Sequence, residues 1–213
     1  MSIFEALERG KQTKLLGRIR ALLSKPRGRS GDILHINSIE ILDGRLSDRI
    51  PAFKRGNVLI CSPQIHAIMV VDLTQRAVVW SMVGSFRFQH HPTVLANGNL
   101  LLFDNRRGPN AQSASLELDA LSGEKVWAYR GSPDEPFFSR CCGTTYRLPN
   151  GNTLIVETEG GRAFEVTPEH DLVWEFVNPH RAGEKDDLIA QLFDLIRLGS
   201  EFSLDWLPPA SGS

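Results

Sequence analysis

Two histidines and a pair of arginines are the residues of this sequence whose types and positions best suit chemistry. His90 begins the stretch HHPTVLANGNLLLFDN, His35 stands in DILHINSIEIL, and Arg106 and Arg107 follow in FDNRRGPN. A neutral imidazole near pH 7 can accept a proton, donate one or attack as a nucleophile. A guanidinium can hold two oxygens of a sulfate or phosphate group. Together these residues predict a site that transfers an oxyanion group and stabilises its developing charge.

The cysteines Cys61, Cys141 and Cys142 offer a weaker alternative. Their odd number argues against a disulfide scaffold, and adjacent cysteines rarely bridge because disulfide geometry strains the peptide between them. No spacing of cysteine and histidine suits zinc. Cys142 aligns with Gln89 in the repeat described below, so a nucleophilic thiol is a second option there, although no neighbouring lysine or histidine favours its thiolate. We expect three buried thiols, no metal and no cofactor.

A repeat in the middle of the chain must position these side chains. Trp80, Trp127 and Trp174 stand at equal intervals of 47 residues. Each closes a similar phrase, DLTQRAVVW, DALSGEKVW or TPEHDLVW, and each is preceded by a second one, RGNVLICS, NGNLLLFD or NGNTLIVE. Polar turns separate short stretches in which polar and apolar residues alternate, which is typical of β-strands. Each repeat therefore predicts four short strands, the size of one β-propeller blade.

The predicted fold is all-β, a partial propeller of about three four-stranded blades over residues 31–180. Innermost strands line the channel of a propeller, so side chains at their starts gather at one end of its axis. Alignment on the Asn-Gly-Asn turns matches His90 with Gly143 and His91 with Thr144, and His35 stands in a comparable place in the first unit. We expect the tryptophans to pack between blades. Closed propellers have about four to eight blades, so a second copy or a missing half would be needed to close the ring.

Helical patterns flank the blades. Residues 1–30 predict a basic N-terminal helix and linker, with apolar residues at helical spacing over 3–24 and a stop at the following Lys-Pro pair. Residues 181–213 predict a C-terminal amphipathic helix and tail. Its helix covers 184–198 and ends at Gly199. Either helix is a candidate to cover an exposed edge or the bottom of a blade, and the sequence does not choose between them.

Charge and hydropathy exclude some classes of protein. The net charge is −1, with 24 basic and 25 acidic residues, so the chain as a whole has no attraction to nucleic acid or to a membrane surface. No apolar run is long enough to form a transmembrane helix. Charges at Glu5, Glu8 and Arg9 interrupt any signal-peptide core. As the chain stands we expect a cytoplasmic protein, with the periplasm as the alternative if its N-terminus is truncated.

The ordered phrases H-x-N-S at His35, Q-H at His90, F-D-N before Arg106, L-P-N-G-N-T-L-I and G-R-x-F-E-V-T-P resemble the arylsulfotransferase family. These bacterial β-propeller enzymes move a sulfuryl group from the sulfate ester of one phenol to another phenol. The resemblance implies the second half of a six-bladed propeller and a two-step exchange through a sulfated histidine. It implies an axial site containing His35, His90 and Arg106 or Arg107. The third unit departs from the pattern, because Gly143 stands where its neighbour has a histidine.

Two functions fit these patterns. The first is sulfuryl transfer between an aryl sulfate and a phenol, with His90 as acid, base or acceptor, His35 assisting, and Arg106 or Arg107 holding the sulfate oxygens. The alternative is a non-catalytic propeller module that binds a ligand or a protein on its axial face, since fold does not decide function. Descent from a quinoprotein propeller is a third and weaker option, because only DALSGEKVW partly matches the tryptophan repeat of that class.

Overall fold

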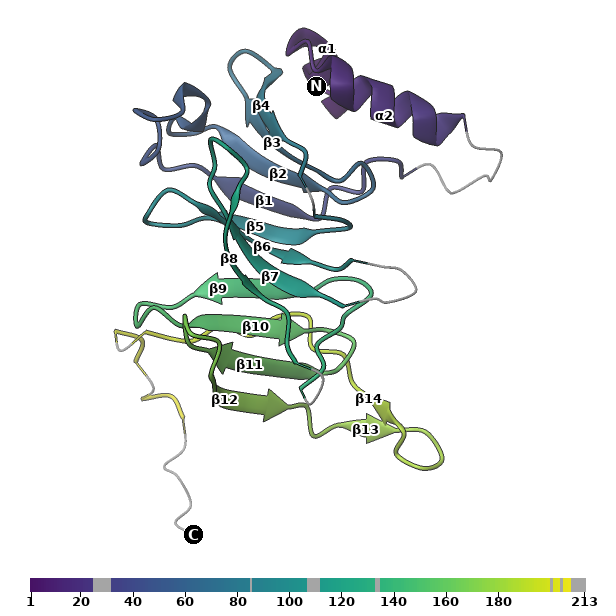
Figure 1. Cartoon of the computed structure of the whole chain (residues 1–213), viewed down its shortest axis with the longest axis vertical. Helices are drawn as coiled ribbons and strands as arrows, with labels where there is room; N and C mark the ends of the chain where they lie inside the picture. Colours follow the sequence, from purple (N-terminus) through teal and green to yellow (C-terminus); the bar gives the residue numbers. More distant parts are fainter. Residues whose placement is uncertain are drawn as a thin grey trace.

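Short alternating segments and tight turns produce three antiparallel four-stranded sheets, which follow one another along the chain (Figure 1). This computed structural model describes residues 1–24, 32–84, 86–106, 112–132, 135–199, 201–203 and 205–207. Arg107 of the predicted site lies outside the described residues. Within each sheet the strands pair in sequence order, as the strands of a propeller blade do. The predicted all-β partial propeller with three blades is confirmed.

The first sheet consists of β1 (Ser38–Ile41), β2 (Val58–Ser62), β3 (Ala67–Asp72) and β4 (Ala77–Met82), with the short 3-10 helix η1 (Pro51–Phe53) between β1 and β2. The second consists of β5 (His90–Val94), β6 (Leu100–Asp104), β7 (Ala114–Leu118) and β8 (Lys125–Tyr129). The third consists of β9 (Thr144–Arg147), β10 (Thr153–Glu157), β11 (Arg162–Val166) and β12 (Leu172–Val177). The first strands of successive sheets, β1, β5 and β9, are neighbours, so they form the inner side of the array.

The predicted hairpin between β5 and β6 turns at Asn97-Gly98. Gly98 has a φ of 91°, a backbone conformation that costs glycine little because it lacks a Cβ. The amide of Leu95 donates to the carbonyl of Asn99 at 2.8 Å, which closes the turn. The same Asn-Gly-Asn phrase turns at Gly151 in the third sheet, with a φ of 89°.

Apolar side chains from alternating strand positions fill the two spaces between the sheets. Leu59 and Ile68 of the first sheet pack against Leu100 and Leu102 of the second, while other apolar residues of the first sheet point to its far side. The second and third sheets share a cluster of buried aromatic and aliphatic residues, Phe103, Tyr129, Phe137, Ile155, Phe164 and Val166. One apolar core thus lies in each junction between sheets.

The repeated tryptophans pack as the sequence predicts in the first two sheets. Trp80 meets the ring of Phe53 edge to face, with centroids 4.9 Å apart, and joins the core between the first and second sheets. The indole nitrogen of Trp127 donates to the carbonyl of Pro168 at 2.9 Å, which ties the second sheet to the third. Trp174 stands on the outer strand β12 and is 38% exposed.

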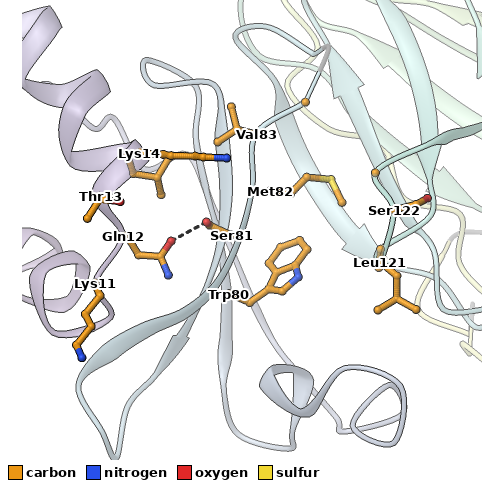
Figure 2. Close-up of a pocket in the computed structure, with 14 residues that line it drawn as sticks. Lys11, Gln12, Thr13, Lys14, Trp80, Ser81, Met82, Val83, Leu121 and Ser122 are labelled. Atoms are coloured by element: carbon orange, nitrogen blue, oxygen red, sulfur yellow. Dashed lines mark hydrogen bonds between the residues drawn. The ribbon is translucent and has the colours of Figure 1, made fainter.

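The N-terminal segment forms two helices, α1 (Ile3–Arg9) and α2 (Thr13–Leu23), where the sequence predicted one. The break falls at Gly10, where a Cβ would lie 1.9 Å from the carbonyl oxygen of Val78, so only glycine allows this approach to β4. Figure 2 shows Gln12 directed at Ser81, whose hydroxyl donates to the Gln12 side chain at 2.8 Å. Within the described ranges, no helix is long and apolar enough to cross a membrane.

The two helices cover the far side of the first sheet (Figure 1). Leu7, Leu15 and Ile19 are almost fully buried against Ile60 and Met69 of the sheet. The N-terminal helices therefore cover a face of the first sheet, whereas the sequence suggested cover of an edge or of the bottom of a blade. Helical amphipathicity places this apolar stripe on one side, as expected for a surface helix.

The predicted C-terminal helix over 184–198 is wrong. A two-stranded hairpin of β13 (Arg181–Ala182) and β14 (Leu188–Ile189) is followed by an irregular, non-helical segment that runs along the third sheet (Figure 1). The amide of Leu192 donates to the carbonyl of Thr158 at 3.1 Å. An isolated helix of this length is marginal in water, so contacts with the sheet override the local helical pattern.

Candidate active site at the starts of the inner strands

Side-chain amides tie the starts of the three inner strands together. The amide nitrogen of Asn37, just before β1, donates to the carbonyl of Gln89, just before β5, at 3.0 Å. The amide nitrogen of Asn105, just after β6, donates to the carbonyls of Ser139 and Cys142, before β9, at 2.8 Å each. These bonds bring segments from all three sheets to one end of the array, where the sequence places His35 and His90.

His90 is held in one tautomer by Asn105. Its Nδ1 lies 2.8 Å from Oδ1 of Asn105 and 3.0 Å from the carbonyl oxygen of Phe88. Because the Asn105 nitrogen already faces two carbonyls, its oxygen must face His90. Nδ1 of a neutral His90 therefore meets two acceptors and carries the ring proton, and Nε2 carries the lone pair. An imidazole fixed in this way presents Nε2 as a base or a nucleophile.

A β-bulge in β5 lies at His90 and His91, and both imidazoles face the junction with the third sheet. His90 pairs with Phe103 and Thr93 pairs with Leu101, so two residues of β5 stand opposite one residue of β6. Such a bulge re-aims side chains and is common beside functional sites. His90 reaches the third sheet through Asn105, and Nδ1 of His91 lies 3.2 Å from the Thr145 carbonyl. Both imidazoles thus belong to the junction between the second and third sheets.

The bulge also shows that the sequence alignment of the second and third repeats is wrong by one residue at His90. Strand pairing places His90 opposite Phe103, Thr144 opposite Val156 and Ser38 opposite Cys61. Phe103, Val156 and Cys61 hold the same place after their Gly-Asn turns. His90 is therefore equivalent to Thr144 rather than to Gly143, because the extra bulge residue shifts the pairing by one.

His91 contacts a phenol and lies near a carboxylate that sequence analysis missed. Its ring meets that of Tyr146 with centroids 4.7 Å apart, and the Tyr146 hydroxyl donates to Asp194 at 2.9 Å. Burial lowers the pKa of His91, while the negative charge of Asp194 acts in the opposite direction. Burial and Asp194 together raise the pKa of Tyr146. A neutral imidazole, a neutral phenol and a carboxylate thus meet beside His90.

Arg106 lies just beyond Asn105 with a φ of 36°. Its Nε donates to the buried carboxylate of Asp104 at 2.6 Å, and its guanidinium side chain is 39% exposed. Burial raises the pKa of Asp104, against the opposing effect of its hydrogen bonds with Arg87 and Arg106. Burial also lowers the pKa of Arg130, and the charge of Arg106 adds to this effect. Arg130, another residue that the sequence did not single out, therefore contributes a second cation near Arg106.

His35 lies near this end of the array but not in an equivalent position. It precedes β1 by three residues and has a φ of 48°, whereas His90 lies on β5 itself. Its Nδ1 contacts Asp32 at 2.6 Å, and its side chain is 52% exposed. The hydrogen bond from Asn37 to Gln89 keeps this segment beside the start of β5. The predicted pair of equivalent histidines from two blades is thus one strand residue and one residue of an exposed loop.

Within the part of the chain that the structure describes, Cys61, Cys141 and Cys142 form no disulfide, and their surroundings differ. Cys61 is fully buried, and burial raises the pKa of its thiol to about 12. Cys141 and Cys142 are only partly buried, which corrects the prediction of three buried thiols. Cys142 has a φ of 59° and accepts the Asn105 hydrogen bond through its backbone. Among the described residues, no group of histidines, cysteines and carboxylates is arranged to hold a metal ion.

A cleft of about 490 Å³ lies elsewhere, between the start of α2, β4 and the turn after β7. Lys14, Ser81 and Met82 line it together with Trp80 and Leu121 (Figure 2). Because β4 is the outer strand of the first sheet and β1 the inner one, this cleft is separate from the end that holds His90.

The sequence profile described as Arylsulfotransferase (ASST) matches residues 22–179. The chain belongs to the arylsulfotransferase family. The match includes all three sheets and both predicted histidines, so the family resemblance of the ordered phrases is confirmed. No curated protein sequence matches this arylsulfotransferase-family chain.

Several solved structures are similar to this chain, at low sequence identity. The WD40 β-propeller domain of Doa1 is 15% identical with a TM-score of 0.47, and the match covers 68% of this chain and 41% of that one. Virginiamycin B lyase from Staphylococcus aureus is 15% identical with a TM-score of 0.45, and covers 70% and 43%. BamB from Moraxella catarrhalis is 17% identical with a TM-score of 0.38, and covers 62% and 38%. The chain spans about two fifths of the length of these structures.

Proposed function

We propose that this arylsulfotransferase-family chain transfers a sulfuryl group from an aryl sulfate ester to a phenolic acceptor through Nε2 of His90. The observation that carries the proposal is the bond between His90 and Asn105. Asn105 is oriented by two backbone carbonyls, so it holds the proton of a neutral His90 on Nδ1. In that tautomer the lone pair lies on Nε2, the nitrogen that we propose attacks sulfur.

The exchange balances in two steps. In the first, Nε2 of His90 forms a bond to sulfur, the ester S–O bond breaks, and the aryl group leaves as phenolate. The charge that develops on the imidazole is stabilised at Nδ1–H by the oxygens of Asn105 and Phe88. In the second step the oxygen of the acceptor phenol bonds to sulfur, the N–S bond breaks, and the acceptor proton passes to solvent. His90 returns to its neutral form.

Arg106 is proposed to hold the sulfate oxygens during these steps. A guanidinium carries five N–H donors, and its Nε–H already donates to Asp104. The charge of Arg130 adds to the positive potential around the Arg106 guanidinium. His35 stays a predicted assistant, because its contact with Asp32 and its exposure offer no direct support for a role at sulfur.

A non-catalytic binding module is the second candidate. It is favoured by the unequal placement of the histidines, since His35 lies in an exposed loop and the third sheet has Thr144 where the second has His90. Such a module would bind an aryl sulfate on the same end without breaking it. Binding of 4-nitrophenyl sulfate measured by calorimetry, with no release of 4-nitrophenolate, would identify this function.

The test of transfer is the release of yellow 4-nitrophenolate from 4-nitrophenyl sulfate in the presence of phenol. We expect His90→Ala to lower kcat/KM at least about a hundredfold, the usual contribution of a nucleophile or base. His180→Ala, at an exposed residue after the last blade strand, is the matched control and should leave the rate unchanged. No release by the wild-type protein, or equal release by His90→Ala, would overturn the proposal.

A further inference from the structure

The junction between the second and third sheets contains a buried carboxylate with a defined set of partners. Glu117 on β7 accepts hydrogen bonds from Asn97 at 2.9 Å and from Asn99 at 2.6 Å, both in the turn of its own sheet. Its other oxygen accepts from Arg147 on β9, the first strand of the next sheet, at 2.8 Å. The carboxylate is therefore paired with a cation from the next sheet.

The third sheet carries the same carboxylate at the equivalent position. Glu117 stands opposite Trp127, and Glu165 stands opposite Trp174. Glu165 accepts from Asn150 at 3.0 Å and from Asn152 at 2.7 Å, again in the turn of its own sheet. The two glutamates thus share their asparagine partners and differ in the source of their cation.

Arg197 of the C-terminal segment supplies the cation for Glu165. Its guanidinium lies 2.7 Å from the carboxylate, whose side chain is 4% exposed. Burial opposes ionisation of Glu165, but the two asparagine bonds and the charge of Arg197 outweigh it and lower the pKa of the carboxyl. Arg197 therefore does for the third sheet what Arg147 does for the second.

Further contacts fix the segment across the inner strand. The carboxylate of Asp194 accepts from the hydroxyls of Thr144 and Tyr146 on β9, at 2.9 Å each. Asp194 and Arg197 are three residues apart, as are Thr144 and Arg147 on β9. Leu192 and Leu195 are half-buried, whereas Phe193 and Ile196 are 62% and 65% exposed.

We propose that residues 190–197 are a strand surrogate, which occupies the place of the first strand of a following sheet and closes the third sheet within the same chain. The position selects its occupant by charge, because Glu165 requires a cation at the place that Arg147 takes in the internal junction. The first sheet of a second copy does not meet this requirement, since the residue equivalent to Arg147 is Ile41. That sheet is also covered on its far side by α1 and α2. This inference does not depend on sulfuryl transfer.

The surrogate is tested by hydrogen exchange of the full-length protein followed by mass spectrometry. We expect Arg197→Glu to speed exchange in peptides covering 188–198 and β10 about tenfold, because the charge reversal opens the local contact. The double variant Glu165→Arg with Arg197→Glu restores the pair in reverse and should slow exchange again. Arg55→Glu is the control, with the same charge change at an exposed residue between β1 and β2.

A second variant covers the case in which Arg197→Glu does not fold. Asp194→Ala removes the contacts with Thr144 and Tyr146 while leaving the Glu165 pair in place, and it should also speed exchange over 188–198. Unchanged exchange in both variants would overturn the proposal. Failure of the reversed pair to slow exchange below that of Arg197→Glu would overturn the role of charge.

Discussion

Oδ1 of Asn105 lies 2.8 Å from Nδ1 of His90, and the nitrogen of the same amide donates to the carbonyls of Ser139 and Cys142 in the segment that leads into the next sheet. The Asn105 side chain therefore joins two blades and favours the tautomer of His90 that carries its proton on Nδ1. The Asn105 side chain is fully buried, so its loss would remove one hydrogen bond each from His90, Ser139 and Cys142.

Asn105→Ala tests this relationship. We expect the variant to lower kcat by about ten- to a hundredfold with a smaller change in KM, because residues that orient a catalytic imidazole have effects of this size. The nitrogen-15 NMR spectrum of His90 should show a smaller share of the Nδ1–H form, because the Phe88 carbonyl is then the remaining acceptor described at Nδ1. Asn178→Ala removes two exposed side-chain hydrogen bonds, with Ala190 and His180, and is the control. An unchanged tautomer in Asn105→Ala would contradict the assignment.

His91 predicts a pH dependence of stability. Its pKa is lowered in the folded state by burial, so the folded protein binds fewer protons than the unfolded chain, whose histidines titrate near about 6.5. The stabilisation from neutral His91 is present above that value and is lost as pH falls through the lowered folded pKa. His66, whose pKa burial also lowers, contributes with the same sign.

His91→Phe keeps a ring against Tyr146 and removes the titration. We expect the free energy of unfolding of this variant to fall less steeply between about pH 6.5 and 5 than that of the wild type, as measured by urea denaturation. In a protein that keeps His91, the substitution Asp194→Asn should lower the pKa of His91 further, because the charge of Asp194 raises this pKa. Proton NMR of the His91 ring measures this pKa. A higher His91 pKa in Asp194→Asn than in the wild type would contradict the electrostatic assignment.

Gly143 and Gly151 form a matched pair for backbone and packing effects. Both have positive φ, at 103° and 89°, but a Cβ on Gly143 would lie 2.6 Å from the Phe103 ring, whereas one on Gly151 would meet nothing within 4 Å. We expect Gly143→Ala to destabilise the fold by about 3 kcal/mol and Gly151→Ala by about 1 kcal/mol. Thermal unfolding of the two variants measures the difference, and equal losses would show that the Phe103 contact is unimportant.

Local signals explain why the blades were predictable. The Asn97-Gly98 turn and the alternation around it specify a hairpin from a few residues, and the equal spacing of Trp80 and Trp127 repeats that unit. The inner position of β5 then follows from the architecture, so the strand that carries His90 could be located. Its bulge could not, because the extra residue is recognised only by pairing with β6.

Contacts between distant residues explain what the sequence did not show. Asn105 stands next to the predicted Arg106, yet its role depends on Cys142, which is distant in sequence. Asp194 belongs to a stretch with a clear helical pattern, and that pattern predicted a helix because it cannot register the buried Glu165 that attracts Arg197. Apolar periodicity therefore fails where several long-range polar contacts hold a segment against a sheet.

The most direct test of the account is to incubate the protein with 4-nitrophenyl sulfate in the absence of an acceptor and to locate any sulfuryl group by peptide mass spectrometry. Sulfuryl transfer through Nε2 of His90 requires one sulfuryl group on His90, its absence in His90→Ala, and its loss when phenol is added. A sulfuryl group on another residue, or 4-nitrophenolate release from His90→Ala at the wild-type rate, would contradict the account.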